Sequence, residues 1–85
     1  MRLPIIKHVN SFIKDYDEDY VNEAIELLEH MADAKGIKDE ELDVIGELLS
    51  NFYGALEVQQ MIKDGKSEKD ALNAFMKRVQ GSIDS

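Results

Sequence analysis

The sequence has 85 residues, of which 44% are apolar and 33% charged; this composition fits one small globular domain and excludes a disordered chain. The lack of cysteine excludes disulfides, thiol catalysis and cysteine-ligated zinc. The net charge of −8 disfavours nucleic acid and anionic membranes as partners, and it favours solubility, a basic partner or the basic end of a second copy.

Four segments have the apolar spacing of helices, and none alternates like a β-strand. The first predicted helix covers residues 4–15, where Pro4 suits the opening turn. The second covers residues 19–34, and Gly36 ends it in the left-handed conformation. Apolar side chains occupy one half of this second helix, and the other half carries acids that include Glu23, Glu26 and Glu29.

The third predicted helix, residues 40–63, is the longest, with a length of about 36 Å at 1.5 Å per residue. Asp39 is its predicted N-cap, and no neighbouring helix is long enough to cover it alone. The fourth helix covers residues 68–80 and begins after Ser67, which caps it. We therefore predict an all-α fold, a compact four-helix domain over residues 1–85 with the third helix as its spine.

The acids of residues 15–26 nearly reproduce the pattern of a calcium-binding EF-hand loop. The sixth position of such a loop requires glycine, but Tyr20 stands there, and Asn22 stands at the eighth position, which is normally apolar. The apolar spacing that follows predicts instead a helix that begins with Asp17 or Asp19 as its N-cap. We predict a helix start without bound metal and keep divalent-metal binding at residues 15–26 as the alternative.

No segment carries a recognisable catalytic motif. His8 and His30 each lack a second ligand at metal-binding spacing within their own helices. The serines lack the glycine-flanked turn of a nucleophile elbow, and no glycine-rich loop is suited to a phosphate. A chain of this length rarely encloses a pocket of about 300 Å³ or more and still keeps a core. We predict no catalytic residue and no cofactor, and we leave open whether the protein is an enzyme.

Small side chains form a ridge on the long helix. Gly46, Ser50 and Gly54 follow one another at a spacing of four, beside Tyr53. Each helix-interior glycine costs about 1 kcal/mol relative to alanine, and small side chains let another backbone approach closely. The partner of this ridge is either the first or fourth helix of the same chain, or the long helix of a second copy.

Three stretches of the chain resemble a small bacterial family of all-helical domains that has no assigned activity: LPIIKH, KDEELDVIGELLSNFYGALEV and ALNAFMKRV. The resemblance covers nearly the whole chain and implies no catalytic or binding residues. It also implies that the protein is encoded beside thioredoxin-like proteins. A chain without cysteine would act there as an adaptor or regulator and not as the redox centre.

These features predict a small acidic interaction or regulatory module that forms a homodimer and has a surface for another protein. The predicted interface consists of Gly46, Ser50, Tyr53, Gly54, Glu23, Glu26 and Glu29. An accessory subunit of an enzyme, such as a thioredoxin-like system, is the second alternative. We expect a cytoplasmic location, because no apolar run reaches the length of a signal peptide or a membrane span.

Overall fold

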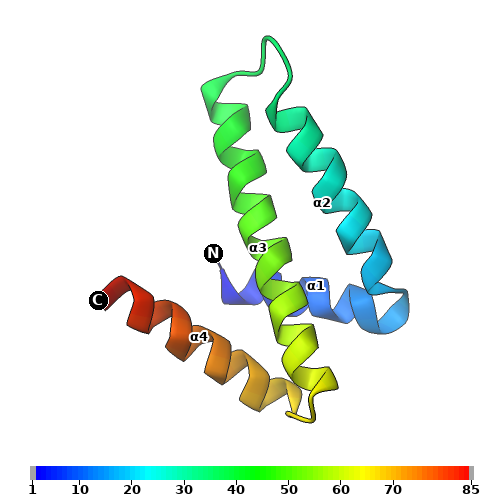
Figure 1. The fold of residues 1–85 in the computed structure, drawn as a ribbon, viewed down its shortest axis with the longest axis vertical. Coiled ribbons are helices and arrows are strands. Elements are labelled where there is room, and N and C mark those ends of the chain that lie inside the picture. Colours follow the sequence, from blue (N-terminus) through cyan, green and yellow to red (C-terminus); the bar gives the residue numbers. More distant parts are fainter. Residues whose placement is uncertain (1, 85) are drawn as a thin grey trace.

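A computed structural model describes residues 2–84 of the chain, with the side chains of residues 2–79. Its four helices are α1 (Leu3–Asp15), α2 (Glu18–Ala32), α3 (Asp39–Lys63) and α4 (Glu68–Asp84), and residues 2–84 form no strand. The longest helix, α3, packs against each of the other three (Figure 1). The predicted all-α fold with the third helix as its spine is therefore confirmed.

The helix starts follow local capping. The side chain of Asp17 precedes α2 and accepts a hydrogen bond of 3.2 Å from the backbone N–H of Asp19. Ser67 caps α4 in the same way. Lys38, one residue before the predicted cap, precedes α3, and its N–H donates to the Glu41 side chain at 3.0 Å.

Two helix ends differ from the prediction. α2 ends at Ala32 instead of residue 34. The backbone N–H groups of Asp33 and Ala34 donate to the carbonyls of His30 and Met31, three residues back, as in a 3₁₀ turn and not as in an α-helix. Gly36 turns the chain with a φ of 84°, as predicted. α4 continues past residue 80 to Asp84.

The main core lies around the second half of α3, between α1 and α4. Its buried apolar side chains are Ile6, Ala55, Val58, Ala71, Leu72 and Phe75. Gly54 lies at the centre of this contact, because a Cβ atom there would lie 3.0 Å from both Ile6 Cδ1 and Phe75 Cζ. A polar pair accompanies the core, in which Gln59 donates a hydrogen bond of 2.9 Å to the buried Asn10.

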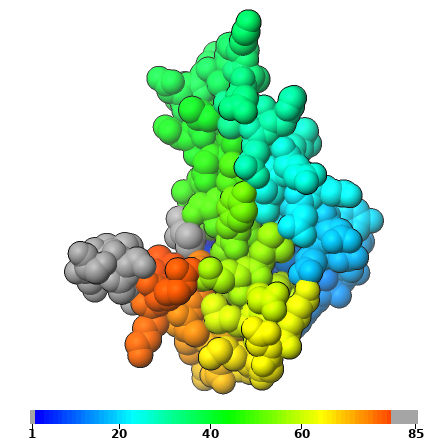
Figure 2. Space-filling model, viewed as in Figure 1, coloured from blue at the N-terminus to red at the C-terminus, as the bar shows by residue number. Residues whose placement is uncertain are grey.

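The first half of α3 and most of α2 form an arm, residues 21–48, that extends beyond this core (Figures 1 and 2). Only Val21, Ile25 and Ile45 are buried apolar side chains within the arm. The molecule is flat, with extents of 43 × 35 × 18 Å, and its radius of gyration is 13.9 Å. A typical folded domain of this length has a radius of gyration of about 12 Å. The arm therefore has little of the chain to cover it.

Among the described residues, no helix combines the length and the apolar character that crossing a membrane requires.

Candidate interaction surface on the arm

One side of the arm exposes large apolar side chains. Leu27 and Met31 on α2 are 60% and 43% exposed, and Val44 and Leu48 on α3 are 59% and 36% exposed. Within each pair the two residues are four apart, so they lie on the same side of their helix. We call these four residues the apolar flank. Isolated exposed apolar residues are ordinary, but four large ones on one side of an arm indicate an interaction surface.

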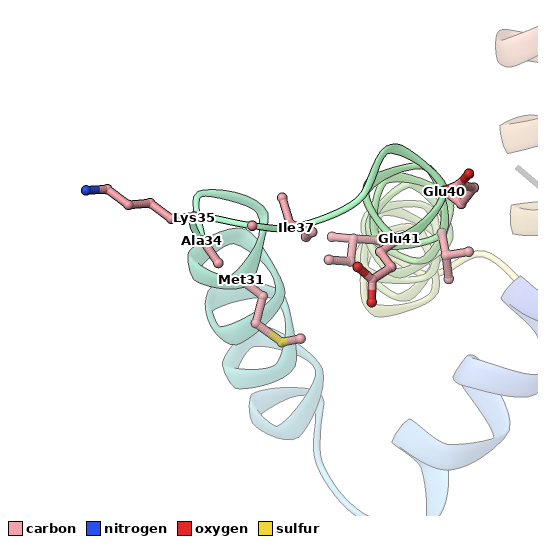
Figure 3. Close-up of a pocket in the computed structure, with 9 residues that line it drawn as sticks. Met31, Ala34, Lys35, Ile37, Glu40 and Glu41 are labelled. Atoms are coloured by element: carbon pink, nitrogen blue, oxygen red, sulfur yellow. The ribbon is translucent and has the colours of Figure 1, made fainter.

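The apolar flank ends at the tip of the arm in an open hollow of about 620 Å³. Met31 of α2 and Ala34, just after that helix, line one side of it, Val44 and Ile45 line it from α3, and Ile37 of the connecting loop lies between the two helices (Figure 3). Lys35 points away from the helices (Figure 3). The hollow shows that the exposed parts of Met31 and Val44 face the same space.

A second hollow, of about 410 Å³, lies at the base of the arm where α1 meets α2 and α3. It is mostly apolar, and we call it the corner hollow; its lining residues are His8, Val9, Phe12, Tyr20, Val21, Ala24 and Phe52. Three exposed aromatic rings stand beside it. The rings of Phe12 and Tyr16 stack at 4.7 Å, and the ring of Tyr20 meets both edge-on at 5.9 and 6.1 Å.

The opposite side of the arm carries a polar contact. Tyr53 donates a hydrogen bond of 2.9 Å from its hydroxyl to Glu29 Oε1, and this bond raises the pKa of Tyr53 above its ordinary value. At 100° per residue, Val44 and Tyr53 lie at about −100° and +80° from the buried Ile45. The Tyr53–Glu29 bond therefore lies across α3 from the apolar flank.

The residues of the predicted interface do not form one surface. Gly54 is buried against α1 and α4 of its own chain and is not available to a partner. Ser50 is half-buried, and Gly46 is exposed, with no atom within 4 Å of the point where a Cβ would stand. The Tyr53 hydroxyl and the Glu29 carboxylate are hydrogen-bonded to each other. The remaining predicted residues, Glu23 and Glu26, are exposed on α2.

The acidic stretch forms the end of α1, a short junction and the first turns of α2. Tyr20 lies inside α2, and among residues 2–84 no residue other than glycine has a positive φ. The stretch therefore does not fold as an EF-hand loop. Among the side chains described, no three His, Asp or Glu residues lie together so that they could hold a metal ion. His30 is exposed on α2.

The apolar flank is the feature that the sequence analysis did not identify. A helical wheel puts Leu27 and Met31 in the apolar half of α2, but it does not show whether another element covers them. One signal was available, because the predicted α3 is too long for its neighbours to cover. That excess length is the part of α3 that carries Val44 and Leu48.

The fold and the arm define an all-helical domain with an uncovered apolar surface. The chain belongs to a family of unknown function (DUF6952), whose model matches residues 1–84. The expected resemblance to a helical family without an assigned function is thereby confirmed. No match was found among curated proteins or among solved structures.

Proposed function

We propose that the protein is an interaction module that works as a homodimer, in which the apolar flanks of two copies pack against each other. The observation that carries the proposal is the exposure of Leu27, Met31, Val44 and Leu48 on one side of an arm that the rest of the chain leaves uncovered. Complete burial of such a side chain contributes about 1.5–3 kcal/mol, so the exposed fractions of eight side chains favour association substantially.

The shape of the arm suits a symmetric dimer. Two helices with one shared apolar side cannot enclose a core, but two such pairs form a four-helix bundle. A two-fold axis brings the same surface of both copies together, as the self-complementary apolar flank requires. Small domains with a limited core often gain stability in this way. The proposal keeps the cytoplasmic location that the sequence suggests.

Charge opposes this dimer only moderately. Residues 21–48 carry nine acids and two lysines, and two such arms repel each other. Glu26 lies on the outer side of α2, whereas Glu23 precedes Leu27 by four residues and lies beside the apolar flank. Charges more than about 8 Å apart are largely screened at physiological salt. This acidic outer side is also where we place a second, basic protein partner. Partners that bind a variant with Glu23, Glu26 and Glu29 reversed to lysine equally well would count against that assignment.

The dimer is tested by sedimentation over a concentration series with two matched variants. Val44→Lys places a charge on the apolar flank, and Leu42→Lys places the same charge at an exposed leucine on the other side of α3. We expect a concentration-dependent dimer for the wild type and for Leu42→Lys, and a monomer for Val44→Lys. A wild type that stays monomeric, or two variants that behave alike, would overturn the proposal. Circular dichroism checks that each variant is helical.

A further inference from the structure

We propose that the corner hollow and the aromatic rings beside it bind a segment of another protein in which an arginine or lysine adjoins a large apolar residue. The apolar side chain enters the hollow, and the cation lies against the rings and the carboxylates around them. This inference rests on one part of the proposed function, the basic protein partner, and names the place where that partner is anchored. It does not depend on the homodimer.

The corner hollow is lined for an apolar side chain. α1 lies across the base of the arm, and the hollow lies in the angle that α1 makes with α2 and α3 (Figure 1). Val9, Ala24 and Phe52 contribute one apolar side chain from each of the three helices. The volume of about 410 Å³ falls within the range of ligand pockets, which is about 300–1,000 Å³.

The aromatic rings beside the hollow form a cluster on the surface. The chain has three phenylalanines and three tyrosines, and three of these six residues, Phe12, Tyr16 and Tyr20, stand exposed together at this corner. The mutual stacking and edge-on contacts of the rings hold the cluster in shape without a partner. Aromatic residues are enriched at protein interfaces, and their ring faces attract cations.

Unpaired carboxylates stand beside the rings. Asp15 follows Phe12 by three residues on α1, and Glu23 follows Tyr20 by three residues on α2, so each lies next to a ring. Asp19 lies one turn before Glu23. All three acids are exposed, and within the described part of the chain none of them forms an ion pair.

The chain supplies too few cations to neutralise this corner. Residues 15–24 carry five acids, and no lysine or arginine occurs between residues 15 and 34. Lys63 of α3 pairs with Glu18 at 2.5 Å, which leaves four of the five acids, and Lys14 is paired with Glu68 of α4 at 3.2 Å. His8, which lines the hollow, is counted as neutral in the net charge of −8. A cation from outside the chain is therefore favoured here.

The combination of rings, acids and an apolar hollow selects the occupant. A guanidinium group stacks on a ring and forms paired hydrogen bonds with a carboxylate, so arginine suits the corner best. A metal ion would use the carboxylates alone, and no three His, Asp or Glu side chains of the described residues lie together to hold one. An acidic segment would be repelled. A basic residue next to an apolar one uses all three features.

Peptide selection identifies what the corner binds. A phage-displayed library of random peptides of about 12 residues is panned against the wild-type protein, and the selected peptides are synthesised and titrated by calorimetry at physiological salt. We expect the selected peptides to share an arginine or lysine next to a large apolar residue. Replacing that basic residue by glutamate should weaken binding by at least about tenfold.

Three double variants locate the contact. Tyr16→Leu with Tyr20→Leu removes two rings without a change of charge, and Asp15→Lys with Asp19→Lys reverses two acids beside the rings. Glu26→Lys with Asp33→Lys makes the same change of charge on the outer side of α2, where both residues are exposed. We expect binding about tenfold weaker in the first two variants and within about threefold of the wild type in the third. Circular dichroism checks that each variant is helical.

The results separate this inference from the proposed function. Selection of no peptide, selected peptides without a basic residue, or equal binding to the wild type and to the ring variant would overturn the inference. Equal losses in the two charge variants would overturn the corner site and leave general attraction of a basic partner. Val44→Lys should bind the peptide as tightly as the wild type, because one chain builds the whole corner; a lost homodimer with intact peptide binding would leave this inference standing.

Discussion

Tyr53 of α3 and Glu29 of α2 are joined by a hydrogen bond of 2.9 Å between the tyrosine hydroxyl and the carboxylate, although 24 positions separate them in the sequence. The bond links the two helices of the arm on the side opposite the apolar flank. Both side chains are exposed, so their contact is a property of the surface of the folded arm and not of its core. It makes the assembly of the arm measurable through the ionisation of one tyrosine.

The first prediction concerns this ionisation. The hydrogen bond to Glu29, followed by partial desolvation and the negative charge of Glu29, raises the pKa of Tyr53. We expect Glu29→Ala to lower the pKa of Tyr53, measured by phenolate absorbance in a background in which Tyr16 and Tyr20 are phenylalanine. Glu26→Ala, on the same helix, is the control and should leave the titration unchanged. An unaltered titration in Glu29→Ala would show that the bond is absent in solution.

The raised pKa of Tyr53 also makes the stability of the protein depend on pH. Because the pKa of Tyr53 is higher in the folded than in the unfolded chain, the protonated hydroxyl contributes to stability below the unfolded pKa of about 10. This contribution is lost as the pH rises through the higher, folded pKa. Urea unfolding of wild type and Tyr53→Phe should therefore converge in strongly alkaline solution, whereas a difference that grows there would contradict the assignment.

The two glycines of the long helix should respond oppositely to alanine. At Gly46 an added Cβ meets no atom within 4 Å, so Gly46→Ala should stabilise the protein by about 1 kcal/mol through helix propensity. At Gly54 the Cβ would lie 3.0 Å from Ile6 and Phe75, which are both fully buried. Gly54→Ala should therefore destabilise by about 1–3 kcal/mol. Urea unfolding measures both, and a stabilised Gly54→Ala would show that α1 and α4 do not pack there.

Breaking the hydrogen bond between the buried Asn10 and Gln59 should destabilise the protein, whereas replacing both residues by leucine should change its stability little. Gln59 donates to Asn10 Oδ1 at 2.9 Å, while Asn10 Nδ2 is buried without a hydrogen-bond partner in the described structure. Gln59→Leu alone leaves the Asn10 oxygen unsatisfied and should cost about 1–3 kcal/mol. The double variant with Asn10→Leu should recover most of that loss. A double-mutant cycle measures the coupling, and strictly additive effects would exclude the pair.

The sequence predicted the helices well because the apolar spacing and the capping residues are local signals. Asp17, Ser67 and Gly36 act where they were expected to act. The sequence could not show which apolar positions are covered. A helical wheel gives the direction of Leu27 or Leu48 around its axis, but it does not show whether another element lies opposite at that height. Coverage depends on where α1 and α4 cross α3, and that crossing is set by the contact of Gly54 with Ile6 and Phe75.

The prediction of interface residues was incomplete for the same reason, because the sequence does not show which positions another helix covers. Gly54 was recognised as a close-approach position, and the structure assigns it to the protein's own α1 and α4, one of the two options that the spacing left open. The acidic residues were recognised as exposed, and Glu23 and Glu26 are exposed on α2. The pairing of Tyr53 with Glu29 depends on the packing of α2 on α3, so no local pattern could reveal it.

The last prediction links the proposed dimer to stability. If the apolar flanks pair only in folded protein, association stabilises the native state by mass action, and the melting temperature should rise with protein concentration. Val44→Lys removes this dependence because it places a charge in the contact, whereas Leu42→Lys should retain it. Thermal melts over a hundredfold range of concentration measure the effect. A concentration-independent melting temperature for the wild type would mean that the exposed Leu27, Met31, Val44 and Leu48 stabilise no assembly of this chain with itself.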